Sequence, residues 1–282
     1  MKEFIRTHKA FSFYTSLVLL VVLIALFSPW LTPNDPFASN LSNALKAPSS
    51  THWFGTDKLG RDVLSRIIYG TGLSLFMGFT IVVLVASIGT LVGSLAGYFG
   101  GKVEMVLMRL CDIMISFPGI VLAIAIAGIM GGSVGNTILA LTIVGWAKYA
   151  RLVRSLVIKV RQEDYIAAAI MSGGTSAVIL RRHVLPNIMP LVVVTASMDL
   201  GVMMLEVAGL SFLGFGAQPP TPEWGLMLNE GRQYLQLAPW LMIFPGAAIL
   251  IVVSFLTFGV TACAIFWIRV KTEAKRRNLY IG

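Results

Sequence analysis

The sequence predicts an all-α polytopic membrane protein with six transmembrane helices. Of its 282 residues, 56% are hydrophobic and 12% are charged, and the mean hydropathy is +0.81. Soluble globular chains carry roughly 25% charged residues, so this chain lacks the polar side chains that would cover a soluble domain. Six apolar runs approach the roughly 20 residues that a helix needs to cross a bilayer. This composition excludes a disordered chain, a nucleic-acid-binding protein and most cytoplasmic enzymes.

The first apolar run, residues 11–31, follows a short basic segment and has no small-residue cleavage site at its end. It therefore predicts a retained anchor helix and not a cleaved signal peptide. The outer segment 32–70 begins with a proline-rich turn and shows helical apolar spacing over 57–69. Pro118 and Pro245 are expected to kink the third and sixth spans. The five spans after the first are expected at residues 73–98, 103–130, 134–149, 187–205 and 239–268.

Basic residues divide unequally between the two sides of the membrane in this arrangement. With the N-terminus inside, 17 lysines and arginines lie on the cytoplasmic side and 5 on the outer side. Cytoplasmic loops carry such an excess, so both termini are expected in the cytoplasm. The chain is expected to consist of an N-terminal anchor helix and outer loop (1–70), a transmembrane core (71–270) that contains an inner loop (151–185), and a basic tail (271–282).

The sequence carries no catalytic or metal-binding constellation. Its three histidines stand singly, and Cys111 and Cys263 lie in apolar runs, where a thiol is usually a small hydrophobic side chain. No phosphate-binding loop and no nucleophile elbow are present. We therefore expect no cofactor on this chain. If ATP drives the protein, another chain binds it.

The inner loop is the longest and most charged connection. Two acids lie in the first turn of a short expected helix, where the positive end of the helix dipole stabilises negative charge. Three alanines give it high helix propensity and a flat surface, and a glycine that accepts the left-handed conformation ends it. The loop is either a plain connector or a docking site for a cytoplasmic partner. The candidate residues are Glu163, Asp164, Ala167, Ala168, Ala169 and Gly173.

Asp199 and Glu206 interrupt the fifth span. An acid at the bilayer centre costs roughly 2.5 to 3.5 kcal/mol on insertion scales, so both need compensation. Helical geometry places them near one face, with Met203 between them. They either pair with residues of a neighbouring span or subunit, or they line a polar translocation path that favours a cationic cargo.

Other charged residues are expected to form local pairs. Asp112 lies three residues after Arg109, a spacing at which helical side chains meet. In the outer loop, Asp57, Arg61 and Asp62 either pair locally in a structural role, which we favour, or contact an extracellular binding protein.

Several segments resemble the importer permeases of ATP-binding-cassette (ABC) systems. The pattern Ala167-Ala168-Ala169-x3-Gly173, with Leu185-Pro186 following, resembles their EAA loop. Residues 54–66 (FGTDKLGRDVLSR), 206–216 and 222–225 look like the C-type subunit of the dipeptide, oligopeptide and nickel permeases. The similarity extends over about residues 11–255. It departs at Ala167, where the motif usually has glutamate, and again from Thr257 onward.

The resemblance implies a type I ABC importer permease fold with no catalytic residue of its own. The inner loop would be a coupling helix in a groove of a cytoplasmic ATPase. The implied partners are a homologous B-type permease, two ATPase subunits that bind ATP and Mg, an extracellular solute-binding protein and membrane lipids, with no nucleic acid.

The implied location is the cell membrane, and the implied cargo is nickel, another metal chelate, or a di- or oligopeptide. The pattern around Asp199 looks more like the nickel-type permeases than the general peptide ones. The alternatives are a self-sufficient channel or secondary transporter, which favours polar rings or inverted repeats, and a membrane enzyme. We see no convincing repeat and no clustered catalytic residues.

Overall fold

The computed structural model describes the backbone of residues 2–279 and the side chains of residues 12–259. Within this range the chain is helical without any strand, and Thr56 and Asp62 form an isolated bridge. The chain divides into two compact units, residues 1–78 with 200–282 and residues 79–199. The side chains of Cys263 and of the expected basic tail lie outside the described part of the chain.

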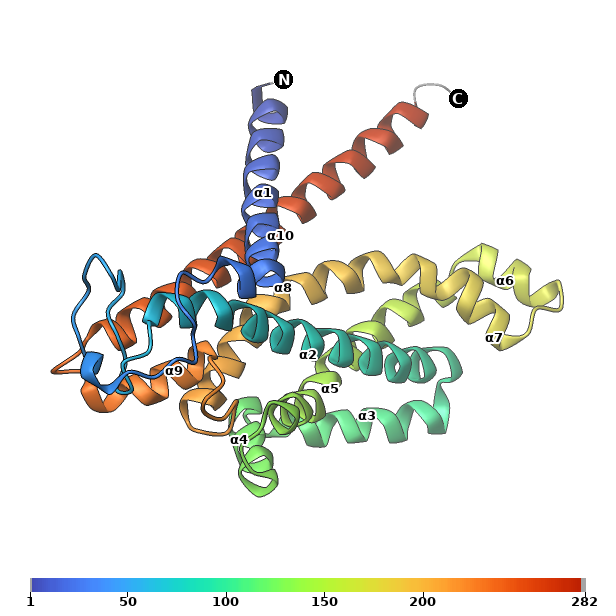
Figure 1. The fold of residues 1–282 in the computed structure, drawn as a ribbon. Coiled ribbons are helices and arrows are strands. Elements are labelled where there is room, and N and C mark those ends of the chain that lie inside the picture. Colours follow the sequence, from blue (N-terminus) through green and yellow to red (C-terminus); the bar gives the residue numbers. More distant parts are fainter. Residues whose placement is uncertain (1, 280–282) are drawn as a thin grey trace. The chain divides into compact units, whose positions relative to one another are not determined.

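The first unit brings the N-terminal helix against the C-terminal one. The rings of Tyr14 and Phe258 lie 5.9 Å apart where these two helices pack together (Figure 1). The C-terminal helix continues without interruption through Pro245. The elements of this unit are α1 (Lys2–Leu31), η1 (Leu41–Asn43), the first part of α2 (Val63–Phe99), the last part of α8 (Leu185–Phe212), α9 (Trp224–Gly231), η3 (Arg232–Tyr234) and α10 (Trp240–Leu279).

Aromatic residues fix the outer loop to the core of the first unit. Trp224 is 2% exposed, and its indole Nε1 donates a hydrogen bond to the Ile67 carbonyl oxygen at 3.0 Å. Phe54 of the loop stacks on Phe244 of α10 with ring centroids 4.0 Å apart. The second half of the outer segment 32–70 is therefore held against α9 and α10.

The first residues of the expected 57–69 helix form a turn, which corrects that prediction. The Asp57 carboxylate accepts hydrogen bonds from the backbone N–H groups of Leu59 and Arg61 at 2.9 and 3.0 Å. An aspartate that binds backbone groups two residues on stabilises a turn in place of a helix. Helix α2 begins only at Val63 and then continues into the second span.

The second unit is built on close contact between α2 and α5. A Cβ on Gly93 would lie 2.4 Å from the Ala150 carbonyl oxygen, and Gly89 and Gly97 face α5 in the same way. Glycine at every fourth position lets the two backbones touch. The elements of this unit are the rest of α2, α3 (Gly101–Ser116), α4 (Gly119–Met130), α5 (Val134–Arg161), α6 (Asp164–Met171), α7 (Ser176–Ile179), the π-helical turn η2 (Leu180–Val184) and the beginning of α8.

The kink expected at Pro118 is confirmed, and it is a full break. Helices α3 and α4 meet there at 89°. Phe117 is extended, with φ −99° and ψ 147°, because the residue before a proline is pushed out of the helical region.

By length and composition, four described helices can cross a membrane, and the α3–α4 pair makes five if it counts as one broken span. The expected span 134–149 is a continuous helix that runs on to Arg161, so the first eleven residues of the expected 151–185 loop belong to α5. Basic residues in the second half of α5 lower its hydropathy below that of the other spans. The four helices that can cross a membrane are Ser12–Leu31, Val63–Phe99, Ser176–Phe212 and Trp240–Gly259.

Candidate functional site

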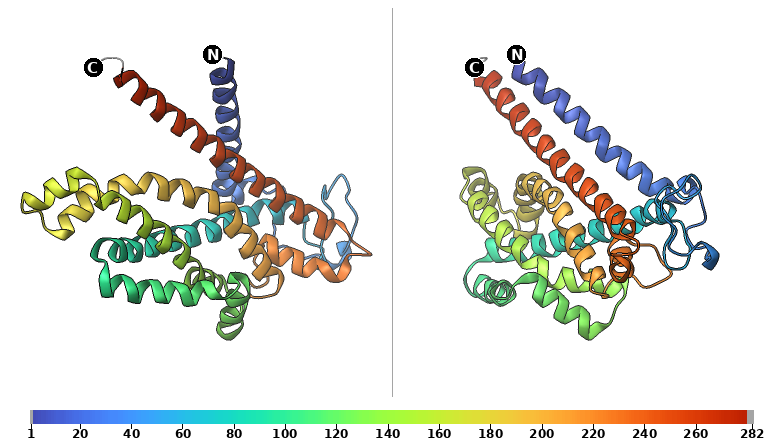
Figure 2. Two further views of the ribbon diagram at one scale, coloured as in Figure 1. Left: turned by 180° about the vertical axis from the view of Figure 1, so that it is seen from behind. Right: turned by 90° about the vertical axis from the view of Figure 1, so that its left-hand side faces the viewer.

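Residues 162–184 form a compact helical connection between α5 and α8, which we call the elbow. Figures 1 and 2 show α6 and α7 at the far end of these two helices. Glu163 is extended at the N-cap of α6, and Asp164 lies in the first turn. Gly173 has φ +81°, which glycine adopts without strain. The short helix, its acidic start and its glycine end are thus as the sequence predicts.

Helix α6 has one fully buried side chain and is otherwise largely exposed. Ile166 is fully buried, whereas Ile170 is 51% and Met171 is 89% exposed. Ala167 and Ala168 are exposed as well, and Ala169 is half-buried. Exposed apolar side chains gathered on a rigid helix mark an interaction surface.

Gly173 is needed for its backbone conformation and not for packing. A Cβ at this position would meet no atom within 4 Å. The backbone N–H groups of Gly173 and Gly174 donate to the carbonyl oxygens of Ile170 and Ala169 at 3.0 and 3.1 Å. These bonds close α6 and turn the chain sharply into α7.

Asp199 pairs with two neighbouring residues of α5. The Lys148 amine lies 3.1 and 3.2 Å from its two carboxylate oxygens, and the Tyr149 hydroxyl donates to one of them at 2.8 Å. Tyr149 is 1% exposed, and the side chains of Lys148 and Asp199 are 67% and 11% exposed. Pairing with a neighbouring span, one of the two interpretations of this acid, is therefore what the structure shows. No local spacing could indicate these partners, because they lie 51 and 50 residues away in the chain.

The other two candidate pathway residues belong to the first unit. Met203 is 8% exposed, and Glu206 is half-buried. Asp199 belongs to the second unit. The structure thus places the three predicted residues on one helix, α8, and pairs Asp199 with Lys148 of α5.

The predicted pair of Asp112 with Arg109 is wrong. The Asp112 carboxylate instead binds the Arg151 guanidinium on α5, and Glu104 likewise binds Arg154. Helix α3 packs along α5, so the partner across the helix interface is reached more directly than the one on the same helix.

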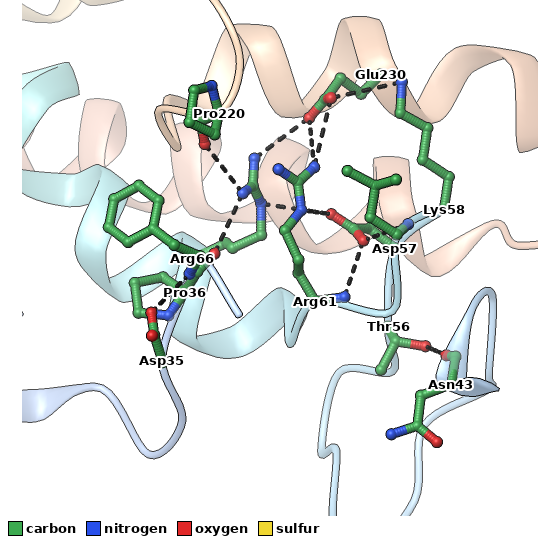
Figure 3. A network of polar contacts seen from close by, with 12 residues as sticks. Asp35, Pro36, Asn43, Thr56, Asp57, Lys58, Arg61, Arg66, Pro220 and Glu230 are labelled. Carbon is green, nitrogen blue, oxygen red and sulfur yellow. Dashed lines mark hydrogen bonds and ion pairs between the residues drawn. The ribbon is translucent and has the colours of Figure 1, made fainter. Parts of the chain in front are cut away.

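The local pairing expected in the outer loop is confirmed. Arg61 Nε donates to the Asp57 carboxylate at 2.6 Å (Figure 3). Asp62 accepts from the Ser65 hydroxyl at 2.7 Å and lies 2.9 Å from His52 Nδ1. These contacts make the loop a folded part of the first unit.

Two further residues of this network were not predicted. Arg61 and Arg66 are each 1% exposed, and both approach the Glu230 carboxylate at 3.3 Å (Figure 3). Arg66 also donates to the Pro220 carbonyl oxygen at 3.3 Å. Buried arginines need such partners, because an unpaired buried charge is costly. Glu230 lies on α9, 169 residues from Arg61, so no local pattern could reveal it.

A second buried acid near this network caps α9. The Glu223 carboxylate accepts from the backbone N–H groups of Gly225 and Leu226 at 2.9 and 2.8 Å. The residue is 1% exposed. Burial raises the pKa of Glu223, and the two backbone hydrogen bonds act in the opposite direction.

Residues 89–267 match a family described as "Binding-protein-dependent transport system inner membrane component". The match includes α5, the elbow and α8. The chain belongs to that family.

Curated relatives are similar to this chain over most of their length. The chain is 47% identical over 232 residues to the dipeptide transport system permease protein DppC of Alkalihalophilus pseudofirmus, covering 82% of this chain and 76% of the relative. It is 41% identical over 235 residues to the nickel transport system permease protein NikC of Escherichia coli, covering 83% and 85%. For the glutathione transport system permease protein GsiD of Pectobacterium atrosepticum, the identity is 43% over 255 residues, covering 89% and 84%.

A chain of known structure has the same fold as this protein. It belongs to the MetNI methionine ABC transporter, described in inward facing conformations, with a TM-score of 0.59 and 21% identity over 72% of this chain and 97% of that one. This match and the family confirm the expected type I ABC importer fold. The identities to DppC and NikC confirm the resemblance to the C-type permeases. The protein is a multi-pass membrane permease of an ABC importer.

Proposed function

We propose that this permease receives a cytoplasmic ATPase on its elbow and converts closure of the ATPase into movement of its membrane helices. The observation that carries the proposal is the exposed apolar surface of α6, a short helix connected to membrane helices on both sides. Ile166 anchors the helix, and Ile170 and Met171 leave an apolar surface for a partner. Glu163 and Asp164 add negative charge at one edge, although Ala167 replaces the glutamate that is usual in the motif.

The elbow is directly continuous with the helices that would have to move. Helix α5 ends at Arg161, two residues before the α6 cap, and the turn η2 leads into α8 at Leu185. A force on α6 therefore reaches two membrane helices through short rigid segments. Rocking of such helices would open the path alternately to the two sides. This chain performs no covalent step in that cycle.

The proposed assembly contains a second, homologous B-type permease, two ATPase subunits and an extracellular solute-binding protein. ATP and Mg would bind to the ATPases. The excess of basic residues on one side of the expected topology supports cytoplasmic termini and a cytoplasmic elbow in the cell membrane. The network around Arg61 would then face outward.

The proposed cargo is a small peptide or a metal chelate such as a nickel complex. The relatives are named for dipeptides, nickel and glutathione, and this supports the proposed range of cargo. The three names together support a small polar solute and do not single out one of these three cargoes.

Asp199, Met203 and Glu206 would border the translocation path. Glu206 is a half-buried carboxylate on α8, and a carboxylate beside the path would favour a cationic cargo. Replacing Glu206 with glutamine should lower uptake of a cationic cargo about tenfold while leaving assembly and uptake of a neutral cargo unchanged. Uptake of matched cationic and neutral dipeptides into vesicles checks this, and an equal loss for both would contradict it.

The elbow is tested by enlarging its open face. Ala168→Trp should reduce the amount of ATPase that co-purifies with the permease at least tenfold, because the bulky ring prevents close approach of the partner. The variant should remain folded, since Ala168 is exposed. Ser155→Trp, an exposed position on α5 outside the elbow, is the matched control and should retain the ATPase.

The opposite outcome would favour the alternative class of protein. If the purified chain alone moved solute into vesicles without nucleotide, it would be a self-sufficient channel or secondary transporter. If Ala168→Trp retained the ATPase fully, the docking surface would lie elsewhere.

A further inference from the structure

We propose that Lys148, Tyr149 and Asp199 form a staple that makes α5 and α8 move together when the elbow is displaced. The staple would set how much transport results from each ATP hydrolysed. This inference rests on the proposed function of the elbow, because it assigns a role to the two helices that flank it. Lys148 and Tyr149 would be positioning residues, since they act through Asp199 and α8.

The staple lies at matching depths on the two helices. Lys148 is 13 residues before the end of α5 at Arg161, and Asp199 is 14 residues after the start of α8 at Leu185. At about 1.5 Å per residue, each position is roughly 20 Å from the elbow. The two helices are therefore joined at the elbow and again at the staple, and this makes a closed frame.

The chemistry of the cluster resists relative sliding of the two helices. Tyr149 and Lys148 approach the Asp199 carboxylate from adjacent positions of α5, at 2.8 Å and 3.1 Å. Moving α8 by a few ångströms along α5 would break both contacts. The Asp199 carboxylate would then be buried without a partner, which is unfavourable.

Tyr149 also lies against α2. A Cβ on Gly89 of α2 would lie 2.3 Å from the Tyr149 Cβ and 2.7 Å from the Trp146 carbonyl oxygen, so α2 and α5 are already in close contact here. The backbone of α5 at Tyr149 therefore cannot shift toward α2. The hydroxyl thus provides a fixed reference point, and the flexible Lys148 side chain supplies the charge.

The exposure of Lys148 allows the role of the charge to be separated from packing. Its side chain is 67% exposed, so Lys148→Met removes the ammonium group with little loss of buried contacts. Tyr149→Phe removes the hydroxyl and retains the ring. A second basic residue on α5, Arg151, binds Asp112 of α3 and not α8, so Arg151→Met is the matched control.

The test measures ATP hydrolysis and uptake in the same vesicles that contain the complete transporter. Lys148→Met should lower the amount of cargo moved per ATP at least fivefold, while hydrolysis stays within twofold of the wild-type rate. Tyr149→Phe should act in the same direction. With a neutral dipeptide as cargo, the double exchange Lys148→Asp with Asp199→Lys should recover at least half of the lost ratio, and Arg151→Met should leave it unchanged.

The results separate this proposal from the proposed function. An unchanged cargo-to-ATP ratio in Lys148→Met overturns the staple, as does a parallel loss of hydrolysis and uptake that the charge exchange does not recover. If Ala168→Trp retains its ATPase, the proposed function of the elbow fails independently of these ratios.

Discussion

Replacing Glu230 with glutamine is expected to lower the free energy of unfolding by about 3 kcal/mol, because breaking a buried ion pair leaves uncompensated charge inside the protein. Glu230 contacts both Arg61 and Arg66 at 3.3 Å, and each arginine is 1% exposed. Asp57 would remain as the acidic partner of both guanidinium groups. The midpoint of thermal unfolding in detergent micelles, followed by tryptophan fluorescence, measures the loss.

Lys58 provides the control for this prediction. Its amine lies 3.6 Å from the same Glu230 carboxylate, but its side chain is 38% exposed. Exposed ion pairs contribute about 0 to 1 kcal/mol, so Lys58→Met should shift the midpoint only slightly. Equal shifts for Glu230→Gln and Lys58→Met would contradict the assignment of the arginine pair as the buried centre of the outer loop.

Gly93→Ala is expected to destabilise the second unit by about 3 kcal/mol, at the upper end of what overpacking costs. The added Cβ would lie 2.4 Å from the Ala150 carbonyl oxygen and 2.8 Å from the Val153 Cβ. Neither neighbour is the flexible end of a side chain, so α2 and α5 would have to separate. Thermal unfolding and the yield of monodisperse protein in detergent report the effect.

A helical glycine with free space serves as the comparison. A Cβ on Gly209 of α8 would meet no atom within 4 Å. Alanine exceeds glycine in helix propensity by up to about 1 kcal/mol, so Gly209→Ala should be neutral or mildly stabilising. A similar loss in both variants would mean that the close approach of α2 and α5 does not limit stability.

The features that sequence reasoning predicted are determined by residues close together in the chain. The break at Pro118 follows from the geometry of the residue before a proline. The end of α6 follows from the left-handed conformation of Gly173, and the apolar runs follow from membrane thickness. Each of these constraints acts within a few residues, so it is visible without a structure.

The features that were missed depend on contacts between distant segments. The i, i+3 spacing favoured Arg109 for Asp112, but α5 offers Arg151 across the helix interface. Glu230 and Lys148 looked like ordinary charges until α9 and α5 were placed beside their partners. The start of α2 was predicted too early because Asp57 binds backbone groups of its own turn.

The glycine contacts between α2 and α5 also restrict how the second unit can deform. Turning α2 about its axis by one residue would bring Thr90, Ser94 and Tyr98 to the side of α5 where the glycines now lie, and a Cβ would clash there. Rotation of α2 against α5 is therefore opposed at three successive turns. A displacement that keeps these contacts carries both helices together about a hinge outside their contact.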